Sequence, residues 1–276
     1  MSSGAAVRRH VPWKSGTLSL LESGAPQDPV ILLLHGVGSG AESWRDQFEE
    51  LPRFGLRVIA WDQPGYGESS PLAMPAPLPD DYADAVMVLA DALKLSRFVL
   101  LGHSLGALIA GAVAARRGGA RLSKLILASP TTGFANAAPE VLRAKIQQRI
   151  DDMTALGPAR LAQQRAKALL SPHASAESVE RVRNVMAALK PEGYIQAVRM
   201  LARGDLLAMA PRITQPSLVL SGTADLTTPE ASCRRIAAAL PQARYVPLPG
   251  LGHACYIEDA HAFDSTLINF LHPENS

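Results

Sequence analysis

Ser104 is the residue of this chain whose surroundings are best suited to covalent chemistry. It lies at the centre of the motif Gly102–Gly106 (G-H-S-L-G), directly after the apolar run Phe98–Leu101. This pattern predicts a strand that enters a helix through a sharp turn, with the serine at its apex. Both glycines are expected, because a side chain at either position would crowd the turn. The turn would expose the Ser104 hydroxyl as a nucleophile.

A serine hydroxyl is a weak nucleophile at neutral pH and needs a neighbouring base. His253 is the best candidate, because an imidazole accepts and returns a proton near neutral pH and this one follows the last apolar run. Asp225 follows the run Leu218–Ser221 and is the candidate acid that orients the imidazole. A surface-loop histidine and a turn aspartate are the structural alternatives. The chain order Ser, Asp, His is that of one known triad arrangement.

Two further turns follow predicted strands earlier in the chain. One is His35–Gly38 (H-G-V-G) and the other is Asp62–Ser69 (D-Q-P-G-Y-G-E-S), in which Asp62 is expected to hold its own glycine-rich turn. Neither continues into the patterns that cradle nucleotide phosphates. The two cysteines, Cys233 and Cys255, have no metal-ligand spacing. We therefore expect neither a cofactor nor a metal.

Short apolar runs alternate with helical patterns along most of the chain, which predicts β-α-β units and a mostly parallel sheet. The strand candidates are Thr17–Leu21, Val30–Leu34, Leu56–Trp61, Phe98–Leu101, Leu125–Ala128, Leu218–Ser221 and Arg244–Leu248. The helix candidates between them are Glu42–Leu51, Pro79–Leu95, Leu105–Arg117, Pro229–Leu240 and Ala260–Leu271. Several strand candidates are unbroken apolar runs, as expected when helices cover both faces of the sheet.

One segment interrupts the alternation. Residues 131–212 contain no strand candidate, and prolines divide them into about four helices. Strand–helix alternation resumes at Leu218, so a separate C-terminal helical domain is excluded. We predict a core domain formed by residues 1–130 and 213–276, with residues 131–212 inserted as a helical cap.

Five motifs in chain order resemble those of the α/β-hydrolase family, and the resemblance covers nearly the whole chain. They are His35–Gly38, Asp62–Ser69, Gly102–Gly106, Gly222–Asp225 (G-T-A-D) and Gly252–His253. The resemblance implies an α/β fold with a mostly parallel twisted sheet of about eight strands, flanking helices and an inserted helical cap. It further implies an oxyanion hole formed by the backbone N–H groups of Val37 and Leu105. His35, Gly36 and Gly38 would shape the oxyanion turn, as Gly102 and Gly106 shape the turn at the serine.

Within this family the chain is similar to the serine branch of enol-lactonases, carboxylesterases and meta-cleavage-product hydrolases. The resemblance implies hydrolysis of a small carboxylic ester or lactone through an acyl-enzyme on Ser104. Cleavage of a vinylogous diketone C–C bond and a non-catalytic binding protein are the alternatives. Ala107 replaces a second glycine common after the elbow, and Ala254 replaces a tryptophan common after the histidine of C–C hydrolases. The second departure counts against C–C cleavage.

The charges and apolar runs of the chain indicate which kinds of partner to expect. A net charge of +2 gives no reason to expect nucleic acid. No apolar run approaches the ~20 residues that cross a bilayer, and no apolar segment follows the N-terminal arginines, so we expect a cytoplasmic protein without a membrane partner. Residues 131–212 carry twelve basic and seven acidic side chains. Solvated helix faces explain this excess best, but Arg143 or Arg149 could hold a carboxylate-bearing substrate. A monomer and a homodimer are both open.

Overall fold

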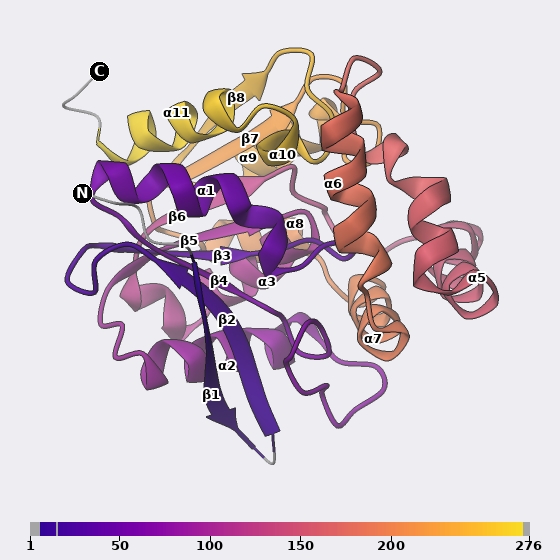
Figure 1. The fold of residues 1–276 in the computed structure, drawn as a ribbon, viewed down its shortest axis with the longest axis horizontal. Helices are drawn as coiled ribbons and strands as arrows, with labels where there is room; N and C mark the ends of the chain where they lie inside the picture. The colour runs from indigo at the N-terminus through magenta and orange to yellow at the C-terminus, as the bar shows by residue number, and fades with distance from the viewer. Residues whose placement is uncertain (1–5, 15, 273–276) are drawn as a thin grey trace.

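The computed structural model describes residues 6–14 and 16–272, and these form an eight-stranded sheet with helices on both faces. The strands are β1 (Val7–Trp13), β2 (Gly16–Ser23), β3 (Val30–Leu34), β4 (Arg57–Trp61), β5 (Phe98–His103), β6 (Leu122–Ala128), β7 (Ser217–Gly222) and β8 (Ala243–Leu248). They lie in the order β1-β2-β4-β3-β5-β6-β7-β8 (Figure 1). The pairs from β4 to β8 are parallel, whereas β1–β2 and β2–β4 are antiparallel. The predicted fold class is confirmed.

All seven strand candidates are strands, and the sequence missed only β1. Every residue of β3, β5 and β7 is buried, as unbroken apolar runs require. β1 has a different character, because its sequence is Val-Arg-Arg-His-Val-Pro-Trp and most of its residues are partly or fully exposed. It forms the edge of the sheet, where one open side and few apolar residues leave no strong strand pattern.

Helices cover the sheet on both faces and bury two apolar clusters. On one face lie α2 (Pro79–Ala92), α3 (Leu105–Ala114) and α9 (Glu230–Ala239). On the other lie α1 (Arg45–Glu50), α10 (Cys255–Glu258) and α11 (Ala260–Leu271). Figure 1 shows α1 and α11 side by side on one side of the sheet and α2 on the other. Only α10 was not predicted, because a single helical turn shows no periodicity.

The segment between β6 and β7 contains helices only. They are α4 (Pro139–Leu142), a π-helical turn (Arg143–Gln147), α5 (Gln148–Arg165), α6 (Ala176–Ala187), α7 (Pro191–Leu201) and α8 (Leu206–Met209). Figure 1 shows α5, α6 and α7 together beyond one end of the sheet. Pro158 was expected to begin a helix, and it does follow a break: Gly157 is non-helical, with φ 69° and ψ 171°, inside α5. No helix among the described residues is long and apolar enough to cross a membrane.

Candidate active site

Ser104 occupies a strained turn between β5 and α3. Its φ of 55° and ψ of −113° are unusual for a residue with a side chain. A Cβ on Gly102 would lie 2.3 Å from the Gly106 carbonyl oxygen, and one on Gly106 would lie 2.2 Å from the Leu34 carbonyl oxygen. Backbone cannot move aside as a flexible side chain can, so both positions require glycine. The strand, turn and helix expected around the serine are therefore present.

Asp225 and His253 lie together. Asp225 follows β7, and its Oδ2 is 2.8 Å from His253 Nδ1. Its Oδ1 accepts the backbone N–H groups of Thr227 at 2.7 Å and Thr228 at 2.9 Å, and the Thr228 hydroxyl donates to Oδ2 at 2.7 Å. Burial alone would raise the pKa of this carboxyl, but His253 and the Thr228 donors bring it to about 2. A carboxylate at Nδ1 favours the Nδ1–H tautomer of an imidazole, which directs Nε2 away from Asp225.

His103 supports the same loop from behind. Its Nε2 donates to the His253 carbonyl oxygen at 2.9 Å, and its ring packs against Tyr256 at 4.9 Å between centroids. Burial, reinforced by the neighbouring His253, lowers the pKa of His103 to about 3, so the ring stays neutral. No role for His103 could be predicted from the sequence, because only the fold brings it to a residue 150 positions away.

The turn at His35–Gly38 is hydrogen-bonded to the turn at Asp62–Ser69. His35 Nδ1 donates to the Gly36 carbonyl oxygen at 2.9 Å, and Nε2 accepts the backbone N–H of Gln63 at 3.2 Å. Burial lowers the pKa of His35, which keeps it neutral for this pair of contacts. The Tyr66 hydroxyl donates to the Val37 carbonyl oxygen at 2.8 Å. These contacts fix the direction of the Val37 peptide, a task that the sequence did not assign to Tyr66.

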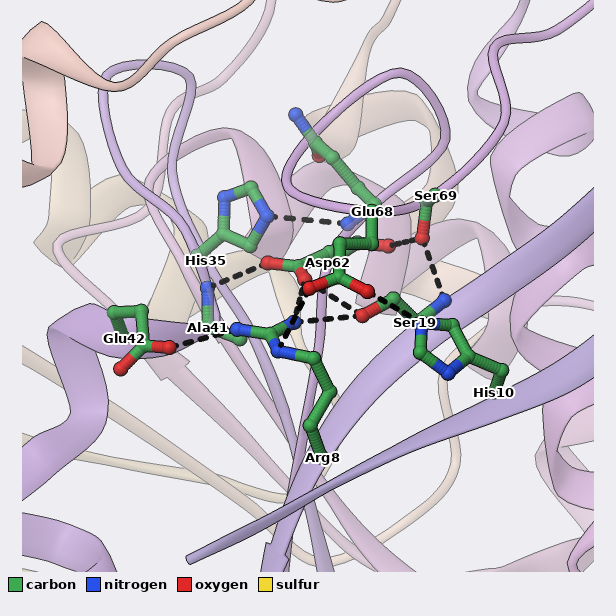
Figure 2. Close-up of polar contacts among 10 residues, drawn as sticks. Arg8, His10, Ser19, His35, Ala41, Glu42, Asp62, Glu68 and Ser69 are labelled. Atoms are coloured by element: carbon green, nitrogen blue, oxygen red, sulfur yellow. Dashed lines mark hydrogen bonds and ion pairs between the residues drawn. The ribbon is translucent and has the colours of Figure 1, made fainter.

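Asp62 joins this turn to the first strand of the sheet. Its Oδ1 accepts the Ala41 backbone N–H at 3.1 Å, and its Oδ2 accepts Arg8 at 2.7 Å and the Ser19 hydroxyl at 3.0 Å (Figure 2). Arg8 also donates to Glu42 at 2.7 Å. The contact with its own turn is present as well, since Ser69 donates to the Asp62 carbonyl oxygen at 2.6 Å. Asp62 thus organises three segments rather than one.

A cavity of about 180 Å³ lies between the sheet and the helical segment. The sheet side supplies Gly36, Val37, Gly38, Ser39, His103, Ser104, Thr131, Thr227, Thr228, His253, Ala254, Tyr256 and Ile257. The helical segment supplies Phe134, Arg149, Arg165, Ala168, Leu169, Val182, Val185, Met186, Tyr194 and Leu201. Ser104 and His253 therefore face one cavity, although no hydrogen bond joins their side chains.

The two arginines suggested by the sequence lie in different surroundings. Arg149 lines the cavity and is partly buried, whereas Arg143 is exposed on the preceding π-helical turn. Arg165, which the sequence did not single out, also lines the cavity. Among residues 6–14 and 16–272, no cluster of three or more His, Cys, Asp or Glu side chains is arranged to hold a metal ion.

Comparisons with known proteins agree with this architecture. The family model described as the alpha/beta hydrolase fold matches residues 29–260. RutD of Klebsiella pneumoniae strain 342, named as a proposed carbamate hydrolase, is 30% identical over 258 residues, which cover 89% of this chain and 92% of RutD.

Two solved structures are also similar over nearly their whole length. The enol-lactonase of Burkholderia xenovorans LB400 has a TM-score of 0.84 and 28% identity, covering 95% of this chain and 99% of that one. A thermophilic esterase of Thermogutta terrifontis has a TM-score of 0.84 and 26% identity, covering 99% and 100%. The present chain belongs to the α/β-hydrolase fold family and is a hydrolase of that fold.

Proposed function

We propose that the protein hydrolyses a small carboxylic ester or lactone through an acyl-enzyme on Ser104. The observation that carries this proposal is the constellation at the cavity wall. A serine on a strained turn and an imidazole held by a buried carboxylate face the same space. This is the chemistry needed to attack an activated carbonyl.

In the proposed reaction, Ser104 Oγ attacks the substrate carbonyl carbon while His253 Nε2 takes the hydroxyl proton. Asp225 holds the ring and stabilises its charged form. The tetrahedral intermediate collapses when His253 returns the proton to the leaving alkoxide. Water then attacks the acyl-enzyme with His253 again as base, and the acid is released. No cofactor takes part in these steps.

The oxyanion of each tetrahedral intermediate would accept the backbone N–H groups of Val37 and Leu105. Leu105 is the first residue of α3, so its N–H has no partner within the helix. Within the described part of the chain, neither amide donates to a protein group. Two free donors beside the nucleophile are what an oxyanion hole requires. The tight packing of Gly36, whose added Cβ would lie 3.2 Å from Ser104 Cβ, supports the same geometry.

The cavity supports a small substrate. Its volume of about 180 Å³ is below the ~300–1,000 Å³ of pockets for drug-sized ligands. Because residues 131–212 supply one wall, we propose to treat them as a cap between the core segments 1–130 and 213–276. The enol-lactonase and esterase activities of the two similar structures support an ester or lactone bond as the target.

The test is the turnover of a short neutral p-nitrophenyl ester by the wild type and by Ser104→Ala. We expect kcat/KM to fall by about 10³-fold or more in the variant, because the nucleophile is lost and only binding and oxyanion stabilisation remain. A matched folding control is the thermal unfolding midpoint, which should be retained. Turnover by Ser104→Ala near the wild-type rate would contradict the proposal and would point to a different nucleophile or to activated water.

A further inference from the structure

The cavity carries a positive charge that no protein group neutralises. Its lining holds two arginines, Arg149 and Arg165, and no aspartate or glutamate. Arg165 is paired with Asp152 at 2.5 Å. In the described residues, Arg149 has neither a salt bridge nor a hydrogen-bond acceptor. A partly buried charge without a partner is unfavourable unless a ligand supplies the partner.

The shape of α5 determines how its charged side chains lie relative to one another. On a straight helix Arg149 and Arg165 would be about 24 Å apart, and Asp152 and Arg165 about 20 Å apart. The break at Gly157 folds the second half of α5 back, which brings Arg165 to Asp152. Both arginines line the cavity. The π-helical turn directly before α5 shifts the register at its start, a feature frequent at functional sites.

The groups around Arg149 indicate which chemical group of a ligand it would bind. Burial lowers the pKa of Arg149, Tyr194 raises it, and the like charge of Arg165 lowers it, but a guanidinium stays protonated in proteins. Tyr194 also lines the cavity, so the cavity wall offers a phenol hydroxyl as well as the guanidinium. The remaining helical lining is largely apolar, for example Val182 and Met186. One guanidinium fork with one hydroxyl suits a single carboxylate.

We propose that Arg149, assisted by Tyr194, binds a carboxylate of the substrate that is separate from the bond cleaved at Ser104. The substrate class is then a small ester or lactone that carries a free carboxylate. This inference rests on the proposed function and narrows it. Of the basic side chains in the helical segment, the inference gives a binding role to Arg149 alone. Arg143 serves as a matched residue outside the cavity.

The test compares two p-nitrophenyl esters of equal acyl length, the pentanoate and the monoester of glutaric acid. We expect the wild type to favour the charged ester at least tenfold in kcat/KM. Arg149→Met should reduce that ratio at least tenfold, and Arg149→Lys should keep part of it, because the charge remains and the fork is lost. Arg143→Met should leave the ratio unchanged. An unaltered ratio in Arg149→Met, or the same loss in Arg143→Met, would overturn the inference.

A binding measurement separates this inference from the proposed function. Free glutarate should raise the thermal unfolding midpoint of the wild type and of Arg143→Met, but not that of Arg149→Met. If this pattern appears while neither ester is hydrolysed in a Ser104-dependent way, the proposed function fails and the carboxylate site stands. If the neutral ester is hydrolysed through Ser104 but glutarate has no Arg149-dependent effect and the charged ester no advantage, the carboxylate site is wrong and the proposed function stands.

Discussion

At the scale of single residues, the candidate site consists of Ser104, the His253 imidazole and the groups that position this imidazole. Asp225 and His253 are joined directly, and Thr228 donates to the same carboxylate oxygen as His253. His103 reaches the same loop through the His253 carbonyl oxygen rather than through its ring. The position of the His253 imidazole thus depends on contacts at both its side chain and its backbone.

We predict that His103→Phe lowers kcat about 10- to 100-fold toward a neutral ester with a smaller effect on KM. The phenyl ring keeps most of the packing against Tyr256 but cannot donate to the His253 carbonyl, so the imidazole loses its alignment. His103→Gln, which retains a donor, should recover part of the loss.

The pH profile distinguishes this positioning role from proton transfer. Since the pKa of His103 is about 3, it does not titrate where ester hydrolysis is measured, and the limbs of the kcat/KM profile should stay in place in His103→Phe. Wild-type activity in His103→Phe, or a displaced acid limb, would contradict this role.

The sequence singled out Ser104, Asp225 and His253 as candidates because each follows a strand in a motif with local meaning. It could not predict Tyr66, His103 or Arg165, since each acts through a contact made only in the folded chain. Arg149 illustrates this limit: the sequence offered it together with Arg143, and only the folded chain shows that Arg149 lines the cavity while Arg143 is exposed.

At the scale of elements, the turns around the cavity are held from outside it. The His253 loop is tied to the helical segment, because the Ala254 backbone N–H donates to the Leu169 carbonyl oxygen at 2.8 Å and Glu258 accepts from Ser171 at 3.0 Å and Gly252 at 2.9 Å. The Val37 turn is tied to β1 through Asp62 and Arg8 (Figure 2). The edge strand that the sequence missed therefore has a structural part in the site.

We predict that Arg8→Met destabilises the fold by about 1–3 kcal/mol, because it leaves the buried Asp62 carboxylate without its cation. Arg9→Met is the matched control on the same strand. Arg9 pairs with Glu22, which Arg57 also holds, and the Arg9 side chain is 49% exposed, so the loss should stay within about 1 kcal/mol. Urea unfolding measures both. Equal losses in the two variants would show that Asp62 does not depend on Arg8.

At the scale of the whole molecule, one buried carboxyl group makes the stability of the fold depend on pH. Asp264, on the buried side of α11, is a carboxyl group almost wholly removed from water. Its Oδ1 accepts Gln47 at 3.1 Å, while Oδ2 has no hydrogen-bond partner. Burial, with the nearby charges of Asp46 and Glu50, raises the pKa of Asp264 to about 7.

This pKa makes stability depend on pH in a definite direction. The folded state holds the Asp264 proton up to about pH 7, whereas the unfolded chain releases it near the ordinary aspartate pKa of 3.8. Between these two values the folded state binds more protons, so this group's contribution to stability falls as pH rises. Asp264→Asn has no such proton. We predict that its stability relative to the wild type improves from pH 4 to pH 7, by about 3 kcal/mol.

Chemical unfolding across this pH range measures the effect. Glu49→Gln is the control, because Glu49 is an exposed carboxylate on α1. Parallel stability curves for the wild type and Asp264→Asn would contradict the assignment.

The fold class, seven of the eight strands and the helical insertion could be predicted because buried parallel strands and amphipathic helices have strong local patterns. The edge strand β1, the one-turn α10 and the folded-back α5 could not. Their conformations are set by tertiary pairing, by a single turn and by one glycine with positive φ, none of which leaves a period in the sequence.

The most direct test of the account is chemical trapping of the acyl-enzyme. The wild type is mixed with a neutral p-nitrophenyl ester, quenched in acid within the first turnover and mapped by peptide mass spectrometry. The account predicts a burst of p-nitrophenol close to one equivalent per chain and an acyl group on Ser104 alone. Steady turnover without a burst or an acylated peptide, or an acyl group on a different residue, would contradict the central claim.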